Sequence, residues 1–153
     1  MKMLEAIKNA ISDYDVAAEV TGSELKVINP KNAKSLSVFE EEYWSRDMKD
    51  CFVEYIVEFS TQHRHFSADE EDGIIDYIKS IMNDEVLPLE FYLDGKRRFG
   101  GEIEIGDLDM LSVSYLSEKY GYEGRYFLPF EYELSSWSGE HDTGRRRASE
   151  LKP

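Results

Sequence analysis

The amino-acid sequence predicts an α+β fold: a single domain with a mostly antiparallel sheet and two or three helices on one of its faces. Some segments repeat apolar residues every three or four positions, as helices do, and others alternate apolar with polar residues, as half-buried strands do. The connections between these segments are short, which favours antiparallel pairing of neighbouring strands. A length of 153 residues also fits one ordinary domain.

The N-terminal half of the chain is expected to hold one helix, a hairpin and two further strands. An apolar stripe predicts a helix at about 2–13. Two short apolar runs, 16–20 and 25–28, flank a Thr-Gly-Ser turn and predict a hairpin. Strands are expected at 35–42 and 52–59. In the second of these, the odd-numbered residues are apolar and two glutamates lie on the opposite face.

The clearest helix signal lies at about 68–83, where isoleucines repeat at helical spacing. Ser67 and Glu70 have the spacing of a capping box. In that motif the serine hydroxyl accepts from the Glu70 amide, and the Glu70 carboxylate accepts from the Ser67 amide. A second hairpin is expected from 87–94 and 99–105, because an Asp-Gly turn signal begins their connection.

Two more elements complete the predicted domain. A third helix is expected at 107–120, capped by Asp107 or Asp109 and ended by Gly121. A last strand is expected at 126–134, where apolar residues alternate with glutamates.

The C-terminal residues differ in composition from the rest. Residues 1–135 are expected to form the single α+β domain. Residues 136–153 are rich in polar and basic side chains and predict a mobile tail.

The charge of the chain restricts its partners. There are 32 acidic and 18 basic residues, a net charge of −14. Such a field repels nucleic acid and anionic membranes and attracts basic proteins. The single cysteine, Cys51, cannot form an internal disulfide, and no signal peptide or membrane-spanning run is apparent. We therefore expect a cytoplasmic protein that binds neither nucleic acid nor membranes.

The alternation on the predicted strands places many carboxylates on the face of the sheet that points away from the helices. This predicted acidic face is the candidate partner-binding surface. Its residues are Glu54, Glu58, Glu90, Tyr92, Glu102, Glu104, Glu131 and Glu133.

A metal site is a weaker candidate. His63 and His65 would lie on one face of an extended segment, a spacing that metals can use. A third ligand could come from Asp69, Glu70 or His141, but nothing in the sequence sets their distance. Two solvated imidazoles at the end of a strand explain the pattern more simply, so no metal or cofactor is expected.

The basic run Lys96-Arg97-Arg98 precedes Phe99-Gly100-Gly101. These glycines do not match a phosphate-binding loop, and no helix start follows them. We expect a turn or bulge at the glycines, and we expect the basic residues to pair with the protein's own carboxylates at the rim of the hairpin.

The segments 53–66, Ser67 to Met82 and Leu87 to Ile105 together resemble the small immunity proteins of bacterial contact-dependent and polymorphic toxin systems. The Trp-Gly and Leu-Pro arrangement of the large immunity superfamily related to yeast cell-wall regulators is not present. The resemblance implies a non-enzymatic inhibitor that binds and neutralises a cognate basic, nuclease-like toxin domain. The alternatives are a small metal-dependent hydrolase that uses His63 and His65, or a non-catalytic subunit of a larger assembly.

Overall fold

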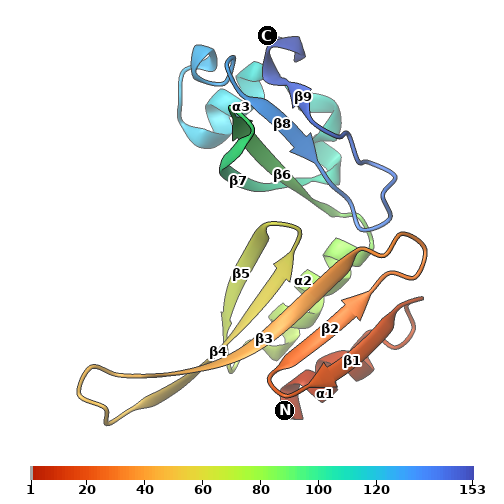
Figure 1. Ribbon diagram of the computed structural model, residues 1–153, viewed down its shortest axis with the longest axis vertical. Helices are drawn as coiled ribbons and strands as arrows, with labels where there is room; N and C mark the ends of the chain where they lie inside the picture. Colours follow the sequence, from red (N-terminus) through yellow and green to blue (C-terminus); the bar gives the residue numbers. More distant parts are fainter. Residues whose placement is uncertain (1) are drawn as a thin grey trace. The chain divides into compact units, whose positions relative to one another are not determined.

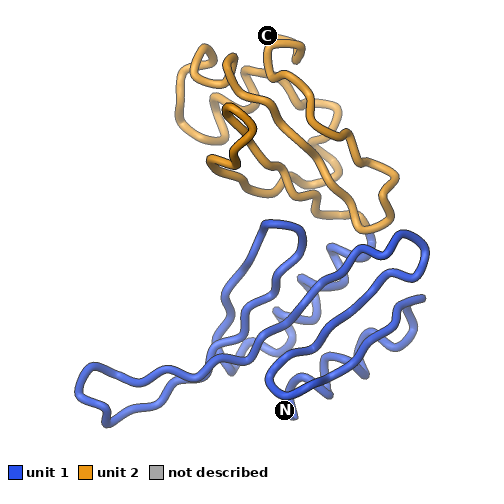
Figure 2. Tube along the Cα trace, in the orientation of Figure 1, with its two compact units in different colours: residues 1–83 blue, residues 84–153 orange. Residues whose placement is uncertain are grey.

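A computed structural model describes residues 2–153, which form two antiparallel sheets with accompanying helices (Figure 1). The chain divides into two compact units, Met1–Asn83 and Asp84–Pro153 (Figure 2). The predicted α+β class and antiparallel pairing are confirmed, with the strands shared between two sheets, one in each unit. Among the described residues, every helix is too short or too polar to cross a membrane.

The sheet of the first unit is a five-stranded meander in which each strand pairs with its neighbour in sequence. The strands are β1 (Ala17–Thr21), β2 (Glu24–Ile28), β3 (Ser35–Trp44), β4 (Cys51–Phe59) and β5 (Gln62–Ser67). The predicted strands at 35–42 and 52–59 are present, but both are longer. Strand β5 was not predicted as an element, because its His-Arg-His run carries almost no apolar alternation.

Two helices cover one face of this sheet, as predicted. Helix α1 (Lys2–Ala10) and helix α2 (Glu71–Met82) turn their buried side chains toward the buried side chains of the strands. On β4 the predicted apolar face is confirmed, since Tyr55, Val57 and Phe59 are all buried. The core is completed mainly by Leu4, Ile7, Leu25, Val27, Leu36, Val38, Phe66, Ile74, Tyr77, Ile78, Ile81 and Met82.

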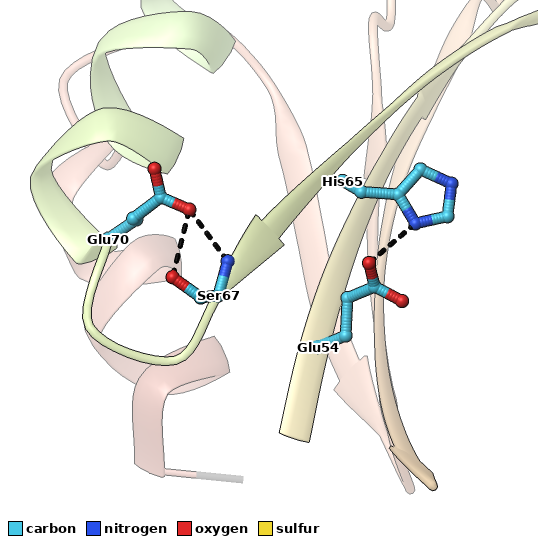
Figure 3. A network of polar contacts seen from close by, with 4 residues as sticks. All are labelled: Glu54, His65, Ser67 and Glu70. Atoms are coloured by element: carbon cyan, nitrogen blue, oxygen red, sulfur yellow. Dashed lines mark hydrogen bonds and ion pairs between the residues drawn. The ribbon is translucent and has the colours of Figure 1, made fainter. Parts of the chain in front are cut away.

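The start of α2 contains half of the predicted capping box (Figure 3). The Glu70 carboxylate accepts a hydrogen bond of 2.7 Å from the Ser67 amide, as expected. The Ser67 hydroxyl does not accept from the Glu70 amide, however, but donates to the Glu70 and Asp69 carboxylates. The helix consequently begins at Glu71, later than the sequence suggests.

The sheet of the second unit has the strand order β7-β6-β8-β9. Its strands are β6 (Val86–Leu93), β7 (Lys96–Glu104), β8 (Glu131–Leu134) and β9 (Arg146–Arg147). The predicted hairpin turn is confirmed: Asp94 and Gly95 have φ values of 52° and 77°. Positive φ at both turn residues is the type I′ geometry that matches the twist of two paired strands.

The segment between β7 and β8 departs from prediction. The expected helix at 107–120 is divided into a 3-10 helix, Ile105–Met110, and helix α3, Val113–Tyr120. The N-cap of α3 is Ser112, whose hydroxyl accepts from the Tyr115 amide. Neither Asp107 nor Asp109 therefore caps this helix. Gly121 ends the helix as predicted. The last strand is also shorter than expected, because a second 3-10 helix, Gly124–Tyr126, and the turn that follows it occupy its start.

An aromatic cluster forms the core of the second unit. Phe91 on β6 is fully buried, and its ring stacks on that of Phe99 with centroids 4.5 Å apart. Tyr120, Phe127 and Phe130 surround these two rings at centroid distances of 5.8 to 6.4 Å from Phe91. Rings at these separations contribute both buried area and favourable edge-to-face contacts.

The residues predicted as a mobile tail, 136–153, are instead packed into the second unit. Trp137 is 5% exposed and Ala148 is fully buried. Strand β9 pairs with β8, and the carbonyl of Lys152 accepts a hydrogen bond of 2.8 Å from the Val113 amide. The prediction is wrong because it weighed the polar composition of this segment and overlooked its few apolar side chains, which are the ones that pack.

Gly101 lies in the regular part of β7, where a bulge or turn was expected; the register shift falls instead between Phe91 and Tyr92. A Cβ atom at Gly101 would lie 2.7 Å from the Tyr120 hydroxyl oxygen and 3.6 Å from its Cζ. That hydroxyl is buried and has no hydrogen-bond partner among residues 2–153. The glycine therefore makes room for the Tyr120 ring to close over the core.

We expect Gly101→Ala to lower the free energy of unfolding by about 1–3 kcal/mol, the usual result of overpacking. In a Tyr120→Phe background the same substitution should cost less than about 1 kcal/mol, because the clashing oxygen is gone. Urea unfolding of the four proteins in this double-mutant cycle measures the coupling. Equal losses in both backgrounds would show that the hydroxyl is not what requires the glycine.

Candidate functional site

The long β3–β4 hairpin extends beyond the other strands of its sheet. The pairing of β2 with β3 ends at Phe39, and the pairing of β5 with β4 begins at Glu54. The intervening part of the hairpin, residues 41–53, which we call the arm, therefore pairs only across the β3–β4 hairpin. Figure 1 shows it projecting from the sheet as a two-stranded ribbon.

The arm exposes large apolar side chains. Tyr43, Trp44, Met48 and Phe52 have exposed fractions of 49%, 52%, 65% and 49%. Tyr43 and Phe52 stack on one face with ring centroids 5.8 Å apart, while Trp44 pairs in register with Cys51 on the other. Single exposed apolar residues are common on protein surfaces, but a group of this size within one hairpin is typical of an interaction site.

Acidic side chains surround these apolar groups. The arm carries four carboxylates and two basic groups: Glu41, Glu42, Asp47 and Asp50 against Arg46 and Lys49. At the base of the arm, Glu54 lies opposite Glu41 in the register of β3 and β4. The apolar side chains are therefore presented in a negative field, in which a basic partner surface is favoured.

The turn at the end of the arm is ordered by its own hydrogen bonds. The Asp47 carboxylate accepts from the Ser45 hydroxyl at 2.5 Å and from the Lys49 amide at 3.2 Å, and these bonds hold the pKa of Asp47 below its ordinary value. The Asp50 amide donates in turn to the Ser45 hydroxyl at 3.1 Å. A turn fixed in this way loses less conformational entropy when a partner binds.

The base of the arm is anchored by Tyr55. Its ring is 4% exposed, and its hydroxyl donates a hydrogen bond of 2.8 Å to the Glu40 carboxylate. Burial, together with the bond to Glu40, raises the pKa of Tyr55 to about 12. The phenol therefore stays protonated and keeps this bond at any physiological pH.

The structure divides the predicted acidic face between the two units. Glu54 and Glu58 lie on the face of the first sheet opposite the buried Tyr55 and Val57. The other six residues share one face of the second sheet, as the alternation predicts. In its register Glu90 pairs with Glu133, Tyr92 with Glu131, Pro88 with Glu102 and Val86 with Glu104.

Two members of that second group are not available to a partner. Glu90 is 2% exposed, and its carboxylate lies 2.5 Å from the Arg97 Nε. Tyr92 is 9% exposed, and the Arg145 guanidinium lies 3.8 Å from its ring centroid. Basic side chains of this unit lie against both residues, Arg97 against Glu90 and Arg145 against Tyr92. The predicted pairing of the basic run with the protein's own acids is confirmed for Arg97.

The imidazoles of His63 and His65 lie side by side on β5, with ring centroids 5.2 Å apart. The Nδ1 of His65 lies 2.8 Å from the Glu54 carboxylate (Figure 3). Neither histidine belongs to a group of three metal-ligating side chains within residues 2–153. Of the third ligands that the sequence suggested, Asp69 and Glu70 are hydrogen-bonded to Ser67, and His141 belongs to the second unit.

The arm itself is what the sequence analysis missed. Tyr43, Trp44 and Met48 fell in a segment between two predicted strands, and Cys51, just before the second of them, is exposed. A usable signal was present, because apolar residues continue on both sides of the polar run 45–50. That pattern predicts a longer hairpin with a turn at 45–50.

Comparison with protein-family models, with curated proteins and with solved structures finds no match to this chain.

Proposed function

We propose that this chain is a binding protein of the immunity type, which neutralises a basic, nuclease-like toxin domain by engaging it through the arm. The observation that carries the proposal is the arm itself: an ordered, projecting hairpin with four exposed apolar side chains in an acidic setting. The resemblance of the sequence to bacterial immunity proteins supports the same function.

The exposed aromatic groups favour a protein partner. Trp and Tyr supply much of the binding energy at protein interfaces, because they bury a large area with few rotatable bonds. A two-stranded ribbon gains little stability from side chains that remain in water. Tyr43, Trp44, Met48 and Phe52 therefore contribute little to the fold and have the composition of a binding surface.

The charge favours a basic partner. The whole chain has a net charge of −14. Within the arm, four carboxylates and only two basic groups accompany the apolar contacts. Opposite charge on the partner accelerates association and aligns the two surfaces before contact. A nuclease-like toxin has a positive surface where its nucleic-acid substrate binds, so an acidic arm seated there would exclude that substrate.

The test uses the protein encoded immediately upstream of this chain. Its C-terminal domain, which we call the candidate toxin domain, should be basic, should arrest growth when expressed alone and should be harmless when co-expressed with this chain. The purified pair should form a one-to-one complex with nuclease activity suppressed. A growth-arresting domain that remains fully active with a saturating excess of this chain would contradict the proposal, as would a metabolic enzyme at the upstream position.

Charge reversal at Glu41 on the arm, and at Glu54 and Glu58 on the adjoining part of β4, should slow binding. We expect Glu41→Lys/Glu54→Lys/Glu58→Lys to reduce the association rate with the candidate toxin domain about 10-fold at low salt and to flatten its salt dependence. Stopped-flow mixing over a range of NaCl concentrations measures both effects.

The matched control is Asp109→Lys/Glu118→Lys/Glu150→Lys, which makes the same change in net charge at three exposed positions of the second unit outside the predicted acidic face. It should slow association much less. If both triple variants slowed binding equally, the net charge of the chain, and not the carboxylates on and beside the arm, would be guiding association.

A further inference from the structure

We propose that Asp84, Glu140 and His141 form a binding site for a divalent cation of the first transition series. One ligand atom from each side chain lies within 4.8 Å of the other two, and these residues are the only such group of three within residues 2–153. All three belong to the second unit, whereas His63 and His65 belong to the first. The proposal is independent of the arm and its partner.

The three side chains are brought together by an ordered loop. Both carboxylate oxygens of Asp84 accept from Ser138, one from its amide at 3.1 Å and the other from its hydroxyl. The His141 amide donates 3.0 Å to the Ser136 hydroxyl, and the Asp142 carboxylate accepts from the Ser136 amide at 2.8 Å. The His141 ring takes no part in these bonds, which involve only its backbone amide. Each Asp84 carboxylate oxygen keeps a second lone pair that can bind a metal.

The donor set indicates the class of cation. One imidazole nitrogen and two carboxylate oxygens suit Zn²⁺ and its neighbours, whereas Mg²⁺ and Ca²⁺ prefer oxygen ligands alone. Two carboxylates held this close repel each other, and a cation between them removes that repulsion. Three protein ligands leave coordination positions open for water.

Binding at this site would join two distant parts of the second unit. Asp84 is its first residue, and Glu140 and His141 follow the buried Trp137 near its other end. A cation held by all three would resist the separation of those segments. The site would therefore raise the stability of the second unit, because an ion that binds only the folded state shifts the unfolding equilibrium.

The test titrates the metal-free, untagged full chain with Zn²⁺ in a calorimeter. We expect one equivalent to bind, and we expect saturating Zn²⁺ to raise the melting temperature by about 5 °C or more. His141→Ala and Asp84→Asn should each weaken binding at least ~10-fold. Asp84→Asn keeps an oxygen that can accept from Ser138, so circular dichroism without metal should be unchanged.

His63→Ala/His65→Ala is the matched control and should bind Zn²⁺ as the unaltered chain does. The proposal is overturned if the chain binds no Zn²⁺ at micromolar protein concentration. It is equally overturned if the loss follows the His63 and His65 substitutions, or if His141→Ala binds with unchanged affinity.

Discussion

Replacing Tyr43 and Trp44 together with alanine is expected to weaken binding of the candidate toxin domain about 100-fold, equivalent to roughly 3 kcal/mol. The two rings lie on opposite faces of the arm and are about half exposed, so both are available to a partner that grips the ribbon. The loss should appear mainly as faster dissociation, because the charges that guide association are untouched. The stability of the chain alone should change by less than about 0.5 kcal/mol.

Surface plasmon resonance with the candidate toxin domain, together with urea unfolding of the free chain, separates these two effects. The matched control is Tyr122→Ala/Tyr126→Ala, which removes a stacked aromatic pair that is also exposed, at 49% and 40%, from the second unit. It should leave binding within about twofold of the unaltered chain. An equal loss from both variants, or no loss from the arm variant, would show that the arm is not the contact surface.

Phe91→Ala is expected to lower the free energy of unfolding of the second unit by about 3–5 kcal/mol. The Phe91 side chain is fully buried, and four aromatic rings pack around it. Its removal forfeits the transfer free energy of the ring and leaves a cavity that rigid neighbours cannot fill. This loss is a large part of the stability of an ordinary domain.

Phe52→Ala is the matched control, since it removes the same ring from an exposed position on the arm. It should change the unfolding free energy by less than about 0.5 kcal/mol. Hydrogen exchange read residue by residue should place the loss caused by Phe91→Ala on β6, β7 and β8. A loss of less than about 1 kcal/mol for Phe91→Ala would mean that this ring is not the centre of the aromatic core.

For the predicted acidic face, the alternation of side chains predicts which face a residue is on but not whether that face is exposed. The period of two on β6, β7 and β8 correctly places Glu90, Glu102 and Glu133 on one face, because side chains on a strand alternate whatever packs beside them. It does not report whether that face meets water. Glu90 is buried because Arg97, across the hairpin turn, reaches back to it. Exposure depends on such long side chains, which alternation does not describe.

The candidate metal site likewise depends on the fold more than on the spacing of residues in the sequence. His63 and His65 stand out in the sequence because they are two residues apart, yet no third ligand joins them among residues 2–153. Asp84 and His141 are far apart in sequence, and only the fold of the second unit brings them together. Spacing along the chain predicts ligands on one element, whereas a ligand set drawn from two segments depends on tertiary contacts.

Residue spacing alone predicts the local structure: the α+β class, the antiparallel hairpins, the Asp94-Gly95 turn and the apolar faces of α2 and β4. Each follows from contacts between near neighbours, which the spacing of residues controls. Three features depend on tertiary contacts: the division of the strands between two sheets, the packing of residues 136–153 into the second unit, and the extension of the arm past its sheet into solvent. The spacing of the arm's residues is that of an ordinary hairpin. Their exposure arises because β2 and β5 end before the arm begins, so nothing in their own sequence could reveal it.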